Sequence, residues 1–302
     1  MQHALLITAY KNYDQIADLI DTVGDKFRCY IHIDKKSKIT RSEIETLAGK
    51  SNVDFISQKY KVNWGGVAHL KAFILLINEA FKDERNKYFH TITGQDFPIK
   101  TPDEIDLFFS QNHGKEYMEY NKLPYSSWEM EQGGYERVDY YSFCDLFNRR
   151  SFWGRAAIKS ILLMQKKLHL KRSYYSGFPA LYGGSTYWSL SRECIGYVIN
   201  YISQNPRFLK RFDYTFCAEE IFFQTIVMDS PFGDKVIKDT LRFIVWEKRN
   251  GNYPANLDLS DEKAISESDA IFARKFEIPV SIALLENIKK KLKEKRKGSE
   301  NL

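Results

Sequence analysis

The sequence predicts an α/β fold with a mainly parallel central sheet and helices on both faces. Three observations carry this prediction. The first 120 residues alternate between short apolar runs and longer segments whose apolar residues recur with the helical period of 3.6. These patterns follow one another in the order of βαβ units, which place helices on both faces of a parallel sheet. The chain of 302 residues, 43% of them hydrophobic, can bury the core that such a fold needs.

The expected elements of the first half of the chain are regular and closely spaced. We expect strands at residues 4–10, 29–34, 53–57, 88–93 and 115–120. Helices are expected between them at residues 13–23, 42–48, 68–81 and 101–110. The last of these helices has a complete start signal, because Thr101 supplies an N-cap, Pro102 the first helical position and Glu104 the capping-box carboxylate.

The second half of the chain is less regular. Residues 121–155 are rich in Tyr, Trp, Glu and Arg and predict a long surface loop of the kind that often carries recognition. Helices are expected at residues 156–168, from Ser191 onward and at 218–228, strands at 185–191 and 241–247, and then a polar loop and a terminal helix. Because no internal repeat or linker is visible, we expect one domain at residues 1–285 and a basic tail at residues 286–302.

The net charge of +6 comes from one short segment. Lys289 to Lys297 holds seven basic residues and one acidic residue, so the rest of the chain is electrically balanced. A distributed basic face for nucleic acid is therefore not expected. Because the segment follows the mostly apolar residues 280–285, it could contact an anionic membrane surface, and a solvated helix end explains it equally well.

The cysteines and the apolar runs favour a cytoplasmic protein. The four cysteines include no Cys-x-x-Cys pair, so neither a zinc site nor a disulfide framework is expected, and a reducing compartment fits best. Residue 1 leads almost directly into the first expected strand rather than into a signal peptide, and the longest apolar run, at residues 72–77, is too short to span a bilayer. We expect a cytoplasmic location, at most peripheral to the inner face of the plasma membrane.

Two familiar phosphate-binding patterns are absent from the sequence. The first strand is followed by Ala9-Tyr10-Lys11-Asn12 rather than by a Gly-rich loop, which removes the main support for a kinase, an ATPase or an NAD-dependent enzyme. No Asp-x-Asp pair occurs in the chain. Ligands of parallel α/β sheets bind beyond the carboxyl ends of the strands, so the candidate residues lie at 8–10, 34–36, 63–66 and 93–96.

Several ordered motifs resemble one family, the core-2/I-branching β-1,6-N-acetylglucosaminyltransferases with the related peptide O-xylosyltransferases. The motifs are HIDKKS (32–37), VNWG (62–65), TGQDFPIKT (93–101), GSTYWSLSRE (184–193) with GYV (196–198), AEE (218–220) and IFARKF (271–276). They stand in the family's order, and the resemblance spans residues 4 to 277. It implies a GT-A-type nucleotide-sugar-binding fold and an inverting transfer from a UDP-sugar.

An inverting transfer needs a carboxylate that takes the proton of the acceptor hydroxyl as its oxygen attacks the anomeric carbon. Glu220 matches the family's base. By position alone, Glu219 and Glu220 are also ordinary acids for the first turn of a helix. Because a helix N-terminus favours the anionic form of a carboxylate, proximity and the position of the acceptor must supply much of the rate.

The resemblance also implies catalysis without a metal ion or another cofactor. A pre-placed cation can stabilise the negative charge that develops on the leaving UDP. Lys275 matches the family lysine in this role. The family's additional arginine has no counterpart at residues 253–258, and Arg249 or Arg274 are the candidates to replace it, although a solvated side chain is the simpler explanation of Arg249.

For the UDP-sugar donor, the resemblance points to residues near the expected strand ends, namely Ile7, Thr8, Ala9, Asp34, Lys35, Lys36, Trp64 and Asp96, together with Lys275. At such positions a carboxylate can accept hydrogen bonds from uracil or ribose, and an aromatic ring can stack on a sugar or a base. Trp64 could instead close the end of the core. Asp96, two residues after Gly94, could serve only the turn.

The resemblance places the acceptor at Arg137, Trp246 and Glu247. A Trp face is a suitable platform for the apolar face of a pyranose, while burial in the core would explain Trp246 as well. Arg137 lies in the irregular loop with Glu129 and Glu136, which resembles the family's charged acceptor-binding loop. Solvated charges are the alternative for this loop.

Together these features predict transfer of N-acetylglucosamine from its UDP-sugar to a hydroxyl of a glycan or a lipid-linked saccharide. Within the same family, the donor could be UDP-xylose or UDP-glucuronic acid. A catalytically silent sugar- or nucleotide-binding protein that keeps the fold is the alternative from another class.

Overall fold

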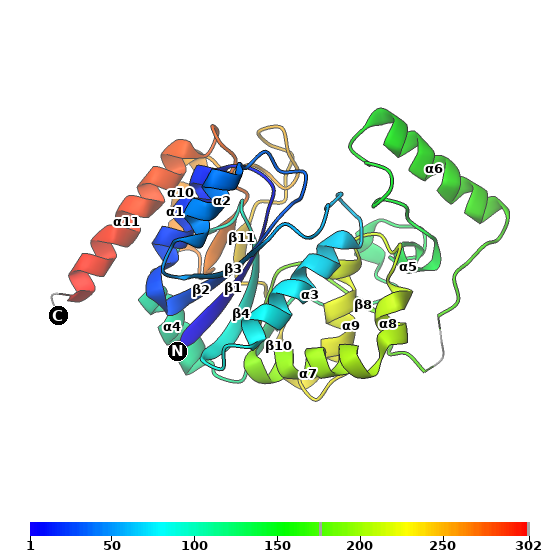
Figure 1. The fold of residues 1–302 in the computed structure, drawn as a ribbon, viewed down its shortest axis with the longest axis horizontal. Helices are drawn as coiled ribbons and strands as arrows, with labels where there is room; N and C mark the ends of the chain where they lie inside the picture. The colour runs from blue at the N-terminus through cyan, green and yellow to red at the C-terminus, as the bar shows by residue number, and fades with distance from the viewer. Residues whose placement is uncertain (175–176, 301–302) are drawn as a thin grey trace.

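The computed structural model describes residues 1–174 and 177–300, and its centre is a seven-stranded sheet (Figure 1). The strands lie in the order β10-β6-β9-β4-β1-β2-β3. β9 runs antiparallel to β4 and β6, whereas the other neighbours in the sheet are parallel. The mainly parallel sheet expected from the sequence is therefore confirmed.

The strands of this sheet are β1 (Gln2–Ala9), β2 (Phe27–Ile33), β3 (Val53–Ser57), β4 (Asn86–Thr93), β6 (Glu116–Met118), β9 (Trp188–Ser191) and β10 (Val236–Ile237). The helices around it are α1 (Tyr13–Val23), α2 (Arg41–Ala48), α3 (Ala68–Phe81), α4 (Pro102–Gln111), α7 (Arg192–Gln204), α8 (Pro206–Arg211), α9 (Phe222–Met228), α10 (Glu262–Glu267) and α11 (Ile282–Glu300). The elements expected in the first half agree with these bounds to within about two residues.

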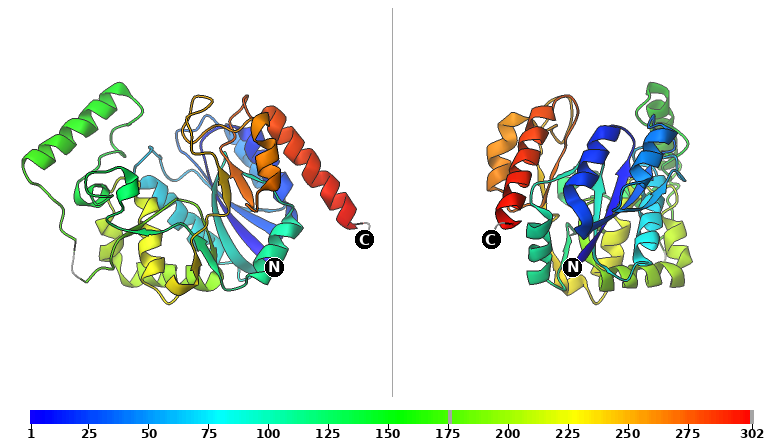
Figure 2. Two further views of the ribbon diagram at one scale, coloured as in Figure 1. Left: turned by 180° about the vertical axis from the view of Figure 1, so that it is seen from behind. Right: turned by 60° about the vertical axis from the view of Figure 1, so that its left-hand side comes forward.

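Alternation along β1 explains why helices cover both faces of the sheet. Successive side chains of a strand point to opposite faces. Leu5 and Ile7 pack in one apolar cluster with residues of α1, α4 and α11, whereas Ala4 and Leu6 pack in a second cluster with residues of α3, α7 and α9. Figure 2 shows the resulting helical layers on the two sides of the sheet.

The helix expected at residues 218–228 is wrong at its start. Ala218–Glu220 form a short 3-10 turn, η3, and α9 begins only at Phe222. In one continuous helix the Glu220 carbonyl would accept a hydrogen bond from the N–H of Gln224. It accepts instead from the N–H of Gly184 at 2.8 Å, and the intervening Ile221 is fully buried with a φ of −126°. Tertiary packing therefore interrupts the helix directly after Glu220.

The strand expected at residues 241–247 is shorter and lies outside the main sheet. β11 (Arg242–Ile244) pairs with β12 (Phe272–Arg274), and β12 pairs with β5 (Phe97–Pro98). At three residues, β12 is too short for a periodic pattern to reveal it. This small sheet brings the chain after β12 next to the end of β4, because the N–H of Phe276 donates to the Gln95 carbonyl at 2.9 Å.

The surface loop expected at residues 121–155 contains short elements and the start of a long helix. β7 (Asn121–Lys122) pairs with β8 (Tyr182–Gly183), and η2 (Ser126–Trp128) and α5 (Glu136–Asp139) follow β7. α6 (Phe152–Lys167) starts before residue 156 because Ser151 caps it, its Oγ accepting from the Gly154 N–H at 3.0 Å. In Figure 1, α6 stands at the outer edge of the molecule, away from the sheet.

α11 runs through the expected boundary between residues 285 and 286. Its Leu284, Leu285, Ile288 and Leu292 are buried in the cluster that also holds α1 and α4. Three of its lysines form ion pairs with the body of the protein: Lys289 with Asp18, Lys291 with Glu262 and Lys295 with Glu104. Residues 301 and 302 of the expected tail lie outside the described residues. In the described ranges, no helix combines the length and the hydropathy that crossing a membrane requires.

Candidate active site

The carboxyl ends of β1, β2 and β4 meet at one edge of the sheet. The N–H of Asp34 donates to the Ala9 carbonyl at 2.8 Å, and the N–H of Gly94 donates to the Thr8 carbonyl at 3.0 Å. The contact between Phe276 and Gln95 adds the end of β12 to this edge. The structure thus brings together the strand ends that the sequence proposes as ligand positions.

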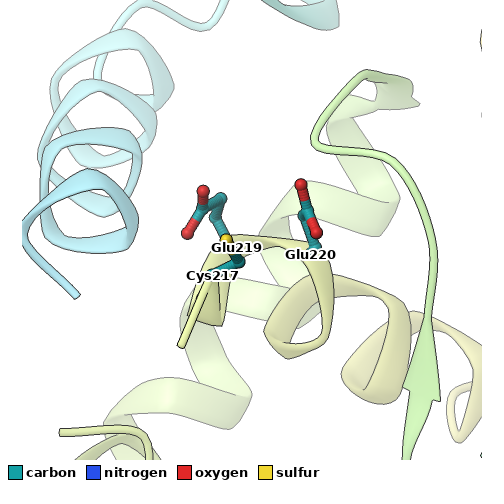
Figure 3. A group of neighbouring side chains, drawn as sticks. All are labelled: Cys217, Glu219 and Glu220. Atoms are coloured by element: carbon teal, nitrogen blue, oxygen red, sulfur yellow. The ribbon is translucent and has the colours of Figure 1, made fainter. Parts of the chain in front are cut away.

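Glu220 ends η3, and its backbone is held tightly. Gly184, whose N–H binds the Glu220 carbonyl, approaches Glu119 so closely that a Cβ on it would lie 2.0 Å from the Glu119 carbonyl oxygen. Only glycine allows this approach. Cys217, just before η3, donates its N–H to the Gly65 carbonyl at 3.0 Å. Figure 3 shows the side chains of this turn, with the Glu219 and Glu220 carboxylates on the same side.

Glu220 combines a desolvated position with a nearby guanidinium. Arg137 Nη1 donates to Glu220 Oε2 over 2.5 Å. Burial, reinforced by the Glu219 carboxylate, raises the pKa of Glu220 to about 7, while Arg137 opposes this rise. The Glu220 side chain still keeps 29% of its surface exposed. An accessible carboxylate with a pKa near neutrality has the properties of a general base, and desolvation rather than a helix N-terminus sets this pKa.

Glu219 makes a separate and buried contact. Its Oε1 lies 3.0 Å from His69 Nδ1, and His69 Nε2 lies 3.1 Å from Thr8 Oγ1 in β1. These two contacts join the strand-end edge directly to the turn that carries Glu220. Nothing in the sequence pattern singles out His69, except that a polar residue stands in the first turn of the helix that follows the VNWG motif.

Both the side chain and the backbone of Arg137 are held in place by contacts. Its guanidinium carbon lies 3.9 Å from the centre of the Trp128 ring, and its carbonyl accepts from the N–H of Phe216 at 3.2 Å. Only 13% of the side chain is exposed. Arg137 is therefore not a solvated loop charge, and it lies against Glu220.

Lys275 follows β12 and is half-buried among other cations. Burial and the neighbouring Arg274, with smaller contributions from Lys11 and Arg150, lower the pKa of Lys275 to about 8. Lys11 is bound by Glu277 at 2.5 Å, whereas Lys275 has no ion-pair partner among the described residues. The edge therefore carries positive charge that its own carboxylates do not neutralise, which suits an anionic ligand.

Neither arginine considered for the missing family position is free. Arg249 pairs with three carboxylates at 2.8, 3.0 and 2.6 Å, those of Glu247, Asp258 and Asp261. Arg274 Nε lies 3.3 Å from Asp96 Oδ1, and its guanidinium stacks 4.2 Å from the centre of the Tyr187 ring. By contrast, Arg150 in the loop before α6 is exposed and lies 5.8 Å from the Tyr10 ring. Its positive charge contributes to lowering the pKa of Lys275.

Comparison with known proteins places the chain in a family. The sequence profile of the core-2/I-branching enzymes matches residues 4–266. The chain belongs to the core-2/I-branching enzyme family. Among curated relatives, xylosyltransferase sqv-6 of Caenorhabditis briggsae is 24% identical over 282 residues, which cover 85% of this chain and 32% of the relative. Xylosyltransferase 2 of Canis lupus familiaris is 24% identical over 276 residues, covering 85% and 29%. The chain thus spans about a third of the length of these relatives.

Solved structures are less similar to this chain. Mouse xyloside xylosyltransferase 1 in its apo form has a TM-score of 0.38 at 10% identity, covering 93% of this chain and 99% of that chain. TarS 1-349 of S. aureus in complex with UDP-GlcNAc has a TM-score of 0.30 at 14% identity, covering 39% and 34%. The family match and the mainly parallel sheet agree with the expected GT-A-type fold. The matched residues include Arg137 and Glu220 but end before Lys275.

The residues expected to bind the donor differ in accessibility. Three of them are buried in β1: Ile7, Thr8 and Ala9. Asp34 is nearly buried, and its Oδ1 accepts from the N–H groups of Lys36 and Val62 at 2.9 and 3.1 Å. Lys36 Nζ donates to Asn63 Oδ1 at 2.6 Å, and Lys35 is exposed. Asp34 and Lys36 therefore order the loop that leads to Trp64.

Asp96 is completely enclosed. Its Oδ2 accepts from Thr93 Oγ1 at 2.7 Å, and its Oδ1 faces Arg274. The contact with Thr93 matches the alternative in which Asp96 serves only the turn. The contact with Arg274 holds that guanidinium beside the same turn.

The two tryptophans expected near substrates lie on the surface. Trp64 is 52% exposed and packs edge-on against Phe216 with ring centres 5.4 Å apart. Trp246 is 62% exposed and lies beside Tyr253 at 5.9 Å. Neither ring closes the core, because at least half of each side chain is exposed. Glu247 is bound by Arg249 at 2.8 Å rather than facing open solvent alone.

One group within the described residues could offer three ligands to a metal ion, since atoms of Cys217, Glu219 and Glu220 lie within 4.8 Å of one another. Burial raises the pKa of the Cys217 thiol well above its usual range, and a metal needs the thiolate. Each carboxylate already has a partner, His69 for Glu219 and Arg137 for Glu220. This donor set therefore fits a catalytic base better than a metal centre.

Proposed function

We propose that this core-2/I-branching enzyme is an inverting glycosyltransferase that transfers a sugar from a UDP-sugar to a hydroxyl of a glycan or lipid-linked saccharide. One observation carries the proposal: Glu220 is an accessible carboxylate with a pKa raised to about 7, and contacts through Glu219 and His69 join it to a cationic sheet edge. A base for the attacking hydroxyl and cations for the leaving diphosphate are what an inverting transfer requires.

The proposed reaction is a single displacement. Glu220 takes the proton of the acceptor hydroxyl while that oxygen bonds to the anomeric carbon on the face opposite UDP. The bond between the anomeric carbon and the diphosphate oxygen breaks, and its electron pair leaves with UDP. The configuration at the anomeric carbon is inverted, and the proton rests on the Glu220 carboxyl group.

Lys275 and Arg150 are proposed to stabilise the leaving diphosphate. Both carry positive charge at the strand-end edge, and Lys275 has no neutralising partner in the described part of the chain. Fixed charges of this kind act in the transition state without metal coordination. We therefore propose that the reaction needs no metal ion or other cofactor. Arg137 orients the base and limits the rise of its pKa.

The donor sugar is proposed to be N-acetylglucosamine or xylose. The resemblance to the branching N-acetylglucosaminyltransferases favours the first, and the xylosyltransferases among the relatives favour the second equally. UDP-glucuronic acid remains a third candidate. A thermal-shift and hydrolysis screen across the three UDP-sugars would identify the donor before the acceptor is known, because donor hydrolysis needs only water as the acceptor.

The acceptor is proposed to be reached from the cytoplasm, at the inner face of the plasma membrane. All four cysteines are free, which matches a reducing compartment. The basic residues Lys289 to Lys297 are proposed to add general attraction to anionic lipid.

Glu220→Gln tests the function. Turnover should fall by roughly 10²–10⁴-fold because the amide cannot take the proton. The affinity for UDP, measured by calorimetry, should stay within about twofold, and the exposed control Glu45→Gln should change neither quantity. Full activity of Glu220→Gln would refute the role of Glu220. A wild-type protein that binds UDP but neither hydrolyses nor transfers any of the three donors would instead be a silent binding protein.

Removal of metal ions tests the second part of the proposal. Activity should survive dialysis against EDTA, because the charge on UDP is met by side chains of the protein. Loss of activity after EDTA, followed by recovery with manganese, would contradict catalysis by Lys275 and Arg150 alone.

A further inference from the structure

The segment of residues 146–172 carries an apolar surface that the proposed reaction does not use. The described part of the chain exposes twenty large apolar or aromatic side chains, and eight of them lie in this segment: Leu146, Phe147, Phe152, Trp153, Leu163, Met164, Leu168 and Leu170. Trp153 is 80% exposed. No described residue of α6 belongs to either apolar cluster of the core. Both views of Figure 2 show α6 at the periphery, apart from α11.

The same segment is strongly basic. It contains no acidic residue and eight basic ones: Arg149, Arg150, Arg155, Lys159, Lys166, Lys167, Lys171 and Arg172. Lys166 binds Glu131, and Arg172 donates to the carbonyls of Arg211 and Asp213. Three others are exposed and have no ion-pair partner within residues 1–174 and 177–300, namely Arg155, Lys159 and Lys167.

The helical period places apolar and basic side chains on one outward face of α6. Residues 152, 156, 163 and 167 are spaced by four, seven and four and therefore share a face. These residues are all exposed, and they are Phe152, Ala156, Leu163 and Lys167. The opposite face is anchored to the protein, because Gln165 is buried and exchanges hydrogen bonds with the backbone of Tyr141 at 2.8 and 3.0 Å. The outward face extends over about 24 Å of helix.

We propose that this outward face of α6 binds the surface of a bilayer that contains anionic lipids. Phe152, Trp153 and Leu163 would enter the boundary between headgroups and acyl chains, while Lys159 and Lys167 contact lipid phosphates. A basic helix with aromatic and leucine side chains is the composition that lies in such an interface. Charge selects this occupant, since a second copy of the face would bring like charges together, whereas an anionic leaflet attracts each lysine.

α11 lacks this combination, although residues 289–297 hold seven basic side chains. The apolar residues that alternate with its lysines, Leu285, Ile288 and Leu292, are buried in the core. Its exposed lysines can attract lipid phosphates, but the exposed large apolar side chain of α11 in the described ranges, Ile282, lies in its first turn, before the lysines. The structure thus places the membrane contact on α6, where the sequence alone points to Lys289 to Lys297.

The position of α6 relates the membrane to the candidate active site. Arg149, three residues before α6, stacks with its guanidinium 4.4 Å from the Phe216 ring and 5.3 Å from the Trp64 ring. A membrane-bound α6 would hold this part of the site beside the lipid headgroups. A lipid-linked acceptor would then be presented to the enzyme directly, a consequence that rests on the proposed function, whereas the binding itself does not.

Vesicle co-sedimentation of the full chain tests the proposal. Wild type should sediment with phosphatidylcholine vesicles that contain 30% phosphatidylglycerol, but not with pure phosphatidylcholine, and salt should weaken the binding. The double variants Phe152→Ser/Trp153→Ser and Lys159→Glu/Lys167→Glu should each lower the partition coefficient by about tenfold or more. The matched variant Lys290→Glu/Lys293→Glu on exposed positions of α11 should lower the partition coefficient less than Lys159→Glu/Lys167→Glu does, because these lysines lie away from the inserted apolar side chains.

Two further measurements separate the possible outcomes. Circular dichroism and UDP binding should be unchanged in the α6 variants, which shows that they remain folded. Sedimentation velocity should show the same oligomeric state for wild type and for Phe152→Ser/Trp153→Ser. The proposal is overturned if wild type does not sediment with anionic vesicles, or if the α6 variants bind these vesicles as well as wild type. It is also overturned if the α6 substitutions abolish only self-association, since a second copy of the protein would then cover this face.

Discussion

The guanidinium of Arg137 and the carboxylate of Glu220 meet at 2.5 Å, although 83 residues separate them along the chain. Burial and the charge of Glu219 raise the pKa of Glu220, and Arg137 lowers it. Only the unprotonated carboxylate can take a proton, so activity should rise with pH through the pKa of Glu220. Substitutions of the two neighbours should therefore move this rise in opposite directions.

Arg137→Met should shift the acidic limb of the pH profile of kcat/KM to higher pH. Loss of an opposite charge in contact with a carboxylate raises the pKa of that carboxylate by about one unit or more, and activity at pH 7 should fall by about tenfold. Arg41→Met, at an exposed arginine that pairs with Glu45, serves as the control. An acidic limb that stays in place would show that Arg137 does not set the charge of Glu220.

Glu219→Gln should shift the same limb to lower pH. This change removes a negative neighbour whose charge raises the pKa of Glu220. It also replaces the carboxylate that contacts His69, so a small loss of kcat from disturbed positioning is expected as well. The measurement is the pH profile of kcat/KM beside that of Arg137→Met. A shift of both variants in the same direction would contradict the proposed electrostatic balance.

Lys275→Arg should extend donor binding to alkaline pH. The pKa of Lys275 is lowered to about 8, so the wild-type lysine loses its charge as the pH rises through this value, and the affinity for UDP should fall. An arginine remains charged throughout this range. Calorimetry with UDP between pH 7 and 9.5 checks the expectation, with Lys293→Arg on α11 as the control. Identical pH dependences in wild type and Lys275→Arg would remove Lys275 from the diphosphate site.

Arg150 and Arg249 should respond differently to the same substitution. Arg150→Met should weaken UDP binding by about tenfold or more, the effect of losing one charge-assisted contact. Arg249→Met should leave UDP affinity within about twofold and lower the melting temperature, because it leaves the carboxylates of Asp258 and Asp261 without their partner. Calorimetry and thermal unfolding distinguish the two effects. The opposite pattern would show that Arg249, and not Arg150, is the second cation that contacts the diphosphate.

The protein should lose stability on acidification from pH 6.5 to about 4. Burial lowers the pKa of both His3 and His32 to about 4, and that of His90 well below its usual range. Between these values and 6.5 each of these rings binds a proton in the unfolded chain but not in the folded chain, so their titration favours unfolding in acid. The raised pKa of Glu220 offsets part of this effect. Each ring contributes on the order of 1.4 kcal/mol for each pH unit in this window.

Denaturant unfolding at pH 7 and pH 5 measures this acid sensitivity. His32→Gln should reduce the difference between the two pH values, since a glutamine oxygen can still accept from the Tyr60 N–H, which donates to His32 at 3.1 Å. His113→Gln, at an exposed histidine, should leave the difference unchanged. Equal pH-dependent changes in wild type and His32→Gln would show that the His32 ring does not contribute to the acid sensitivity.

Local patterns in the sequence were sufficient to predict most strands of the sheet and to identify the family. The continuous apolar run from Ala4 to Ile7 predicts a buried strand, and the structure places these residues in both apolar clusters. The Thr101 to Glu104 capping box predicts the start of α4, and both of its hydrogen bonds are present. These features depend on residues within a few positions of one another, which is why periodicity and capping chemistry reveal them.

Contacts between distant parts of the chain decided what the sequence could not. The Gly184 N–H ends the helix pattern at Glu220, Arg137 and Glu219 set the charge of that residue, and Arg150 lies near Lys275. Likewise, the basic residues of α11 and α6 look alike in sequence, and only packing shows which helix keeps its apolar face exposed. The sequence by itself determined the fold class and the candidate base. Burial and long-range pairing, which no local pattern encodes, decided the electrostatics around Glu220 and the exposed face of α6.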